Sequence, residues 1–457
     1  MKFLATLILV LTFKIVIAQS VDETTIRQIF TTSLTEGQSY SNLEYLTTKI
    51  GQRLSGSPGA QTAVDWTKKV MEDYGFDSVW LQPVMVPYWV RGQKEIGRII
   101  RSKMEKPVEV NVCSLGGSIG TGPKGILASV IEVKSFTELT QLGSKVVQGK
   151  IVFFNRPMDS KQIDPFHAYS GAVDQRGRGA AEAAKYGAIA VIVRSMGVNS
   201  EDYPHTGGMH YELNEVKIPA LAISTKHADA LSNALKEDKT IQFYLESHSE
   251  ILEDAPSFNV VGQINGGEYK DEIIVVGGHL DSWDLAQGAH DDGAGCVQSI
   301  EVLRIFNAMG YKPKRTIRAV MFMNEENGLR GGVKYAELAT ANKEKHIAAI
   351  ESDRGGFAPR GFTMTMTDIV RTKVQSWKPL LEPYGLTDFG QEGGGADIGP
   401  LGRQGVPVME FLPDPQRYFT YHHTKEDTFD KVDKRELELG AASMAAMVYL
   451  IDKYGMK

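Results

Sequence analysis

The sequence is poor in cysteine, since its 457 residues contain only Cys113 and Cys296. Two cysteines far apart in the chain cannot build the disulfide framework on which small secreted domains depend. Cys296 is expected to be a small buried apolar residue. An excess of basic residues is also absent, because the formal net charge is −6 and no basic run occurs. We therefore expect no nucleic-acid partner.

Long apolar runs are absent as well, apart from one at the start of the chain. Lys2 precedes an apolar stretch at 3–13, which has the length of the hydrophobic region of a signal peptide and is too short to span a bilayer. Val16 and Ala18 occupy the small-residue positions of a cleavage site. We predict that residues 1–18 are a signal peptide, that the mature protein is secreted or periplasmic, and that it has no membrane span.

The rest of the sequence alternates between apolar runs typical of strands and amphipathic patterns typical of helices. This alternation predicts an α/β protein with a mostly parallel sheet between two helical layers. A glycine-rich stretch begins near 108, and the segments GKIVFF, RGAAEAAKYGAIAVIV and KIPALAIS follow it in that order. These segments resemble a protease-associated domain, a small β-rich module inserted in several exported peptidases. We expect the main domain at 19–107 and 249–457, with the inserted module at 108–248.

Some segments keep two interpretations at this level. Apolar residues at helical spacing in 21–34 indicate a helix that is either a propeptide or part of the fold. His205 and His210 are expected to be solvated residues of a loop in the module, with substrate contact as the alternative. The stretch GGGAD at 393–397 either lines a substrate pocket or is a structural loop.

Four apolar runs, at 273–276, 317–323, 347–350 and 406–411, are predicted to be strands of the main sheet. Polar side chains follow each of them. In chain order these are His279 and Asp281, then Asn324, Glu325 and Glu326, then Glu351 and Asp353, and lastly His422 and His423. Because sites in open α/β sheets form outside the carboxyl ends of the strands, we expect these residues to meet at one edge.

Two imidazoles and three or four carboxylates suit zinc but exceed the ligands of one tetrahedral site. We therefore predict two zinc ions per chain that share one carboxylate. Asp291 lies in a glycine-flanked turn and is the natural bridge, whereas Asp292 is expected to support the turn. In an extended segment His279 and Asp281 point the same way, so Asp281 is placed to hold the imidazole by its second nitrogen.

Spacing alone leaves three choices open for the other ligands. Each choice is between two close neighbours: Glu325 or Glu326, Glu351 or Asp353, and His422 or His423. His290, beside the acidic pair, is interpreted as an ordinary loop residue.

The same motifs resemble the co-catalytic zinc aminopeptidase family, which also contains glutamate carboxypeptidase II. The likeness lies in H-x-D at 279–281, Asp-Asp at 291–292, Glu-Glu at 325–326, Asp353 and HTKEDT at 423–428. The resemblance implies His279 and Asp353 as ligands of one zinc, Glu326 and His423 as ligands of the other, and Asp291 as the bridge. It further implies Glu325 as general base, Asp281 as a supporting catalytic residue, His422 as a substrate contact, and a homodimer.

By this resemblance the protein is expected to be an exopeptidase that hydrolyses dipeptides or short peptides with a free N-terminus. Glu325 would take a proton from the attacking water and pass it to the departing amine. A glutaminyl-cyclase-like acyltransferase would need only one zinc, and a receptor-like relative would have lost its metals. All five ligand positions are filled, which favours the hydrolase.

Overall fold

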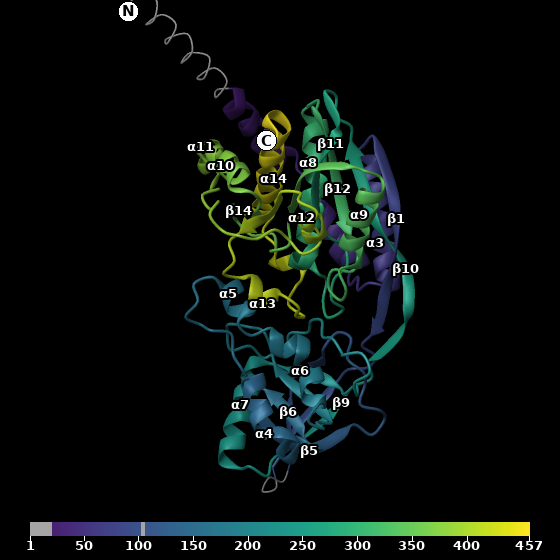
Figure 1. The fold of residues 1–457 in the computed structure, drawn as a ribbon, viewed down its shortest axis with the longest axis vertical. Helices are drawn as coiled ribbons and strands as arrows, with labels where there is room; N and C mark the ends of the chain where they lie inside the picture. Colours follow the sequence, from purple (N-terminus) through teal and green to yellow (C-terminus); the bar gives the residue numbers. More distant parts are fainter. Residues whose placement is uncertain (1–20, 102–105) are drawn as a thin grey trace, which may run out of the picture.

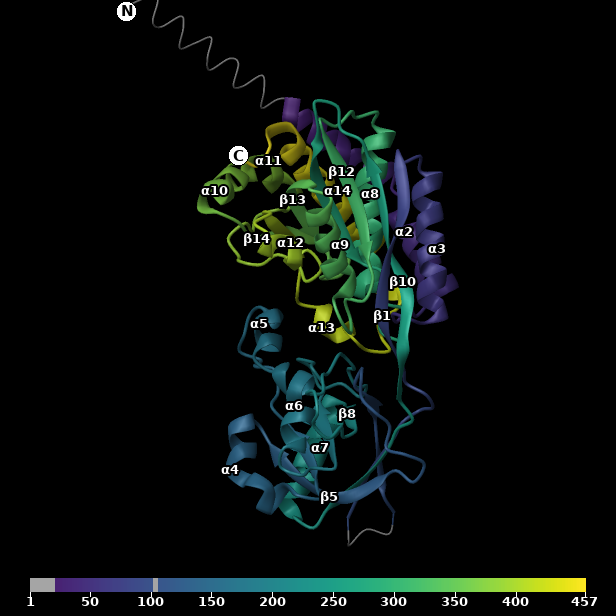
Figure 2. The ribbon, with the colours of Figure 1, turned by 45° about the vertical axis from the view of Figure 1, so that its right-hand side comes forward.

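The computed structural model describes residues 21–101 and 106–457, so the predicted signal peptide at 1–18 lies outside the described residues. Two β-sheets organise the chain, one with seven strands and one with eight. Figures 1 and 2 show them as two bodies stacked along the long axis, the seven-stranded sheet above and the eight-stranded sheet below.

The seven-stranded sheet combines a parallel centre with antiparallel edges. Its strands are, in spatial order, β1 (Ser78–Val90), β10 (Glu250–Ile264), β12 (Arg315–Phe322), β11 (Tyr269–His279), β13 (Lys345–Glu351), β15 (Val408–Pro413) and β14 (Pro359–Thr365). The neighbours from β12 to β15 are parallel, whereas β1, β10 and β14 run antiparallel to theirs. The prediction of an α/β fold is confirmed. The expectation of a mostly parallel sheet is wrong, since three of its six strand pairs are antiparallel.

Both faces of this sheet are covered by helices. α3 (Pro58–Asp73), α8 (Ala294–Ala308) and α14 (Lys434–Tyr454) pack on one face, and α9 (Arg330–Ala341) and α12 (Gly399–Arg403) on the other. In β11, Ile274 and Val276 pack in the apolar cluster that contains α8 and α14, and Ile273 and Val275 pack in the cluster that contains α9 and α12. Burial on both faces explains why this strand is a continuous apolar run rather than an alternating one.

The segment at 21–36 is helical and belongs to the core of the upper body. Ile26 and Ile29 are fully buried in the same cluster as α14. Asp22 accepts hydrogen bonds from Tyr449 (2.7 Å) and Tyr454 (2.5 Å). The segment is therefore packed as part of the fold, which is one of the two interpretations that the sequence left open.

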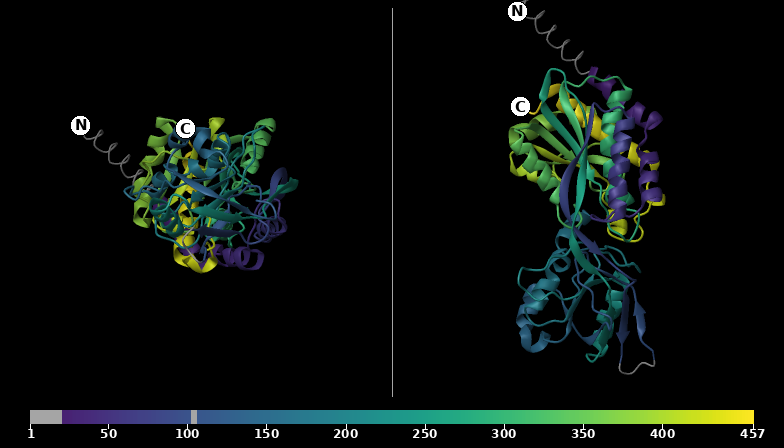
Figure 3. Two further views of the ribbon diagram at one scale, coloured as in Figure 1. Left: turned by 90° about the horizontal axis from the view of Figure 1, so that it is seen from below. Right: turned by 90° about the vertical axis from the view of Figure 1, so that its right-hand side faces the viewer.

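The eight-stranded sheet forms a separate module at 96–246. Its strands are β3 (Val108–Val110), β2 (Ile96–Ile100), β9 (Gln242–Glu246), β5 (Ile126–Val133), β6 (Ile151–Phe154), β7 (Ala190–Arg194), β8 (Ala220–Ile223) and β4 (Val112–Ser114). Strands β5 to β8 are parallel, and the module also contains α4 (Phe136–Val147), α5 (Pro165–Ser170), α6 (Asp174–Ala184) and α7 (Thr225–Glu237). The second sheet thus begins before the expected boundary at 108, because β2 pairs with β9. Figure 3 shows the long β1–β10 ribbon joining the two bodies.

Shorter helices complete the chain. They are α2 (Ser39–Tyr45), η1 (Leu46–Ile50), η2 (Ala289–Gly293), α10 (Asp368–Ser376), α11 (Lys378–Leu381), η3 (Glu382–Tyr384), α13 (Tyr418–Tyr421) and η4 (Phe429–Lys431). Both cysteines are free and buried. Among the described residues, no helix has the length and apolar character needed to cross a bilayer.

Candidate metal centre

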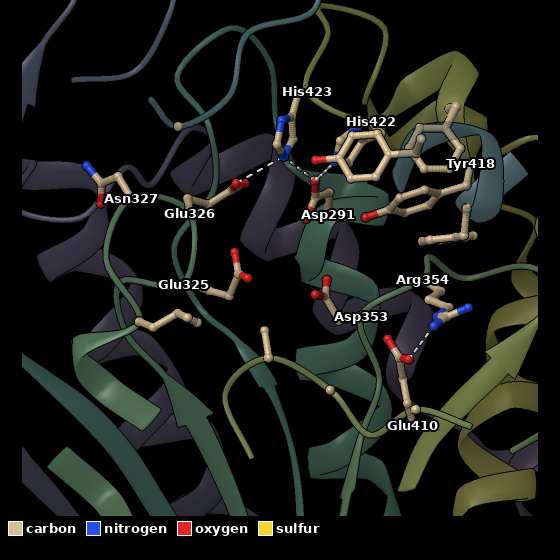
Figure 4. Close-up of a pocket in the computed structure, with 18 of the residues that line it drawn as sticks. Asp291, Glu325, Glu326, Asn327, Asp353, Arg354, Glu410, Tyr418, His422 and His423 are labelled. Carbon is tan, nitrogen blue, oxygen red and sulfur yellow. Dashed lines mark hydrogen bonds and ion pairs between the residues drawn. The ribbon is translucent and has the colours of Figure 1, made fainter. Parts of the chain in front are cut away.

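The predicted residues meet at the carboxyl ends of the parallel strands, on the side that faces the module. Figure 4 shows Asp291, Glu326, Asp353 and His423 pointing into one space. His279 is the last residue of β11 and reaches the same space. Parallel strands that end at one edge therefore bring together side chains that lie up to 144 positions apart in the sequence (279 to 423).

Asp291 lies between the two histidines. The Nε2 atom of His279 is 3.2 Å from Asp291 Oδ1 and 3.2 Å from Asp353 Oδ1. The Nε2 atom of His423 is 3.2 Å from Asp291 Oδ2 and 3.1 Å from Glu326 Oε2. Each imidazole thus faces two carboxylates, and one carboxylate is common to both.

These atoms also border a shared space. Three of them, His279 Nε2, Asp291 Oδ2 and Asp353 Oδ1, are buried and make no hydrogen bond within the described chain, and the same holds for Oε1, the second carboxylate oxygen of Glu326. Two ligands that bind one tetrahedral zinc ion at about 2.1 Å lie about 3.4 Å apart, which is close to the measured separations. Nitrogen and carboxylate donors at this spacing fit zinc.

The charges of the cluster favour a bound cation. Burial, followed by the negative charge of Asp291, raises the pKa of Glu326 well above its usual value of 4.5. Burial also opposes charge on His279, but Asp353 and Asp291 together raise the pKa of this imidazole well above 6.5. A positive ion among these groups removes the conflict, because it allows every carboxylate to be ionised and both imidazoles to be neutral ligands.

Asp281 contacts His279 through a different group from the expected one. The Nδ1 atom of His279 lies 2.9 Å from the main-chain oxygen of Asp281, whereas the carboxylate oxygen is 3.9 Å away. The carboxylate instead accepts hydrogen bonds from the backbone N–H groups of Asn324 (2.7 Å), Glu325 (3.1 Å) and Glu326 (3.4 Å). The backbone of Asp281 therefore orients the imidazole, and its side chain orients the two glutamates.

Two further aspartates hold the turn that carries Asp291. Asp292 accepts hydrogen bonds from the backbone N–H groups of His279 and Gly295, both at 2.9 Å, as expected of a residue that supports the turn. Asp427 accepts from the backbone of His290 (2.7 Å) and Asp291 (3.1 Å). Asp427 belongs to the HTKEDT motif, but its position there gave no indication of this role.

The structure separates Glu351 from Asp353, whereas His422 and His423 both lie near Asp291. Glu351 turns away from the cluster and accepts hydrogen bonds from the backbone of Ala396 and Ile398, at 3.0 and 2.9 Å, so it fixes the GGGAD loop. Asp353 faces His279 instead. His422 stacks on His423 with ring centroids 3.5 Å apart, and its Nε2 atom is 3.9 Å from Asp291 Oδ2.

Two buried basic residues behind the site are structural. The ring of His290 stacks between Phe357 and Tyr421, and burial lowers its pKa to about 3. Arg53 is fully buried and donates to the main-chain oxygens of Leu280 (2.8 Å) and Gly288 (3.0 Å). Arg53 thus fixes the loop between His279 and Asp291, a role that its position in the GQRLSGSPG loop did not predict.

A cavity of about 610 Å³ opens beside the cluster and extends to the module. Glu325 and the glycines of GGGAD line it on the upper side, and Tyr169 and Arg176 line it from the module. Arg176 donates a hydrogen bond to Tyr169 (2.7 Å), and its buried Nε atom has no acceptor among the described residues. Sequence patterns gave no signal for these residues.

An ion pair forms another wall of the cavity. Arg354 and Glu410 lie 2.5 Å apart, and Figure 4 shows them below and beside Asp353. The Arg354 guanidinium also stacks over Phe166 of the module, 4.3 Å from the ring centre. This pair is buried for most of its surface and was not recognised from the sequence.

The two histidines of the module loop have different surroundings. His210 is exposed and lines the cavity. His205 is buried, with 1% of its surface exposed, which corrects the expectation of a solvated loop residue. It lies between Glu201 and the main chain of His422.

Known proteins match both the sequence and the fold. The family model of Peptidase family M28 matches residues 259–448. Carboxypeptidase Q from Bos taurus is 36% identical over 91% of this chain and 85% of its own length, and carboxypeptidase Q from Homo sapiens is 35% identical over the same shares. The stretches GQRLSGSPG at 51–59 and YHHTKEDT at 421–428 had indicated a relationship to the same protein.

Solved structures extend this comparison. A Peptidase M28 precursor from Shewanella amazonensis has a TM-score of 0.90 at 34% identity, covering 96% of this chain and 99% of that one. An aminopeptidase from Aneurinibacillus has a TM-score of 0.64 at 23% identity over 93% of this chain and 95% of its own, so it shares the fold. The chain therefore belongs to peptidase family M28, and the prediction that it is a metallo-exopeptidase is confirmed.

Proposed function

We propose that the protein is an exported exopeptidase that uses two zinc ions to hydrolyse dipeptides or short peptides with a free N-terminus. One observation carries the proposal: the carboxylate of Asp291 lies 3.2 Å from both His279 Nε2 and His423 Nε2. A carboxylate between two imidazoles is the arrangement that a pair of ions sharing one ligand requires.

The ligands divide into two sets around Asp291. His279 and Asp353 would hold one zinc, and Glu326 and His423 the other. Zinc bound by these residues would supply Lewis acidity, which would polarise a peptide carbonyl and lower the pKa of water toward neutrality.

Glu325 is proposed as the general base. Its side chain points into the cavity between Glu326 and Asp353 (Figure 4). Its backbone is held by Asp281, so the carboxylate is fixed beside the metal cluster without being part of it. From there Glu325 can take a proton from water and deliver it to the departing amine.

The cavity suits a small charged substrate. Its volume of about 610 Å³ lies in the range of small-molecule sites. Arg176 lies 3.4 Å from His423 Nδ1 and has an unused buried donor, so it is placed to bind the carboxylate of a short peptide. Glu410 and Arg354 line another wall and are placed to contact the N-terminal residue.

Several features of the wider molecule belong to the same proposal. The module at 96–246 is proposed to be a protease-associated domain, because its GKIVFF, RGAAEAAKYGAIAVIV and KIPALAIS segments follow the order of that domain. Signal-peptide removal and a secreted or periplasmic location are proposed from the apolar stretch at 3–13, and a homodimer is proposed from the resemblance of the chain.

The decisive experiment is a panel of dipeptides assayed with and without chelator. We expect hydrolysis of dipeptides with both ends free, loss of activity with chelator and its return with Zn²⁺. Dipeptides with a blocked N-terminus are the matched control and should be poor substrates. Two bound zinc ions would also separate a hydrolase from an acyltransferase that needs one. Activity that survives complete metal removal would contradict the proposal.

A further inference from the structure

The metal-facing histidine His423 has a backbone conformation that needs external support. Its φ angle is 62°, in the left-handed region that residues with a side chain rarely adopt. Such conformations persist where the surrounding structure holds them in place. The supports of this turn are therefore part of the metal centre.

Two of these supports come from the module. The backbone N–H of Thr206 donates to the main-chain oxygen of His423 at 2.9 Å. The Nδ1 atom of His205 lies 3.0 Å from the main-chain oxygen of His422. Because a carbonyl oxygen can only accept, Nδ1 carries the proton. The carbonyls of two consecutive residues are thus held by two consecutive residues of the other body.

His205 is itself held rigidly. Its other ring nitrogen, Nε2, lies 2.9 Å from Oε2 of the buried Glu201. Its backbone N–H donates to Ser195 Oγ (2.8 Å), and the Ser195 hydroxyl donates to the main chain of Ile223 in β8. A continuous set of hydrogen bonds therefore joins the second sheet to the turn at 422–423.

Among the described residues, the other metal-facing residues have no hydrogen bond to the module. His279 and Asp291 are held by the backbone of Asp281 and by Asp292 and Asp427, all from the upper body. The two halves of the metal centre therefore differ in their support. Within the described residues, the half that contains His423 is hydrogen-bonded to the module, and the half that contains His279 is not.

We propose that Glu201 and His205 are positioning residues for His423, so that the module sets the affinity of the zinc ion held by Glu326 and His423. This inference rests on the proposed two-zinc site. Residues that orient a metal ligand typically change metal affinity by about 10–100-fold when replaced. We expect His205→Leu to lower the affinity for one of the two zinc ions by that factor and to leave the affinity for the other unchanged.

The test is a zinc titration of the metal-free full chain against a chelating dye. His205→Asn keeps a side-chain N–H where Nδ1 lies and should restore most of the affinity. The matched control is His248→Leu, which removes another histidine–glutamate pair at the edge of the module, with Glu246 at 3.0 Å. The control should bind both ions as the wild type does.

The outcomes separate the inference from the proposed function. The inference would be overturned if His205→Leu bound both zinc ions with wild-type affinity. It would also be overturned if the affinity for both ions fell equally. Binding of only one zinc by the wild type would instead overturn the two-zinc proposal. If His205→Leu does not fold, Glu201→Ala leaves the imidazole in place without its support. Glu201→Ala should lower the affinity for the same zinc ion, and an unchanged affinity for that ion would refute the inference.

Discussion

Replacing Glu325 with glutamine tests the chemistry most directly. The change keeps the shape of the side chain but removes the proton acceptor. Within the described chain the carboxylate makes no ion pair with the metal-facing histidines, and its backbone hydrogen bond to Asp281 is kept. General-base catalysis typically contributes about 10²–10⁴-fold, which corresponds to a barrier higher by about 3–5 kcal/mol. We expect kcat to fall by that factor while KM and the zinc content stay the same.

The stability of the variant provides an independent check. Burial, and then the negative charges of Asp353 and Glu326, raise the pKa of Glu325 well above 4.5 in the metal-free protein. A neutral amide needs neither a buried charge nor a bound proton at this position, so metal-free Glu325→Gln should unfold at the wild-type temperature or above it.

Steady-state hydrolysis of a dipeptide, with zinc measured by mass spectrometry, would decide the matter. Glu326→Gln is the matched control at the neighbouring position, and it should lose zinc as well as activity. A Glu325→Gln enzyme that binds both ions and keeps kcat within tenfold of the wild type would refute the role of Glu325 as base.

Three other perturbations follow from described contacts. Asp281→Asn should lower kcat/KM by about 10–100-fold with zinc still bound, because the carboxylate orients the backbone of Glu325; unchanged kinetics would contradict this. Phe30→Ala should cost about 3–5 kcal/mol in denaturant unfolding, because Phe30 is buried and stacks on Tyr384 at 3.9 Å; an unchanged midpoint would mean that residues 21–36 do not stabilise the fold. Burial raises the pKa of Glu301 from 4.5 to about 7, so the folded state retains a proton that the unfolded state has lost. Wild-type stability should therefore fall by up to about 3 kcal/mol as pH rises from about 4.5 to 7; Glu301→Gln should lack this fall, and equal pH profiles would refute it.

Much of the upper body could be predicted because its signals are local. The four central strands are buried on both faces, so each appears as a continuous apolar run, and the side chains after them meet at one edge. β10 was not recognised, because its first half is largely exposed and has no continuous apolar pattern. It also forms a ribbon with β1, a pairing that depends on residues far away in the sequence.

The parts of the site that sequence reasoning missed depend on contacts between distant segments. His205 and Arg176 lie in the module and approach His423 only when the two bodies are assembled. The spacing of His279 and Asp281 correctly placed them together. It could not show that the main-chain oxygen of Asp281, rather than its carboxylate, accepts from the imidazole.

The packing of residues 21–36 against α14 has a consequence for the order in which the chain can fold. Tyr449 and Asp22 form a hydrogen bond although 427 positions separate them, and Figure 1 shows the two helices in contact at the top of the molecule. Contacts of such separation form late. The eight strands at 96–246 are contiguous and can close while synthesis continues. The apolar face of the helix at 21–36 stays exposed until α14 has been synthesised. Until then this face is a surface that chaperones can bind.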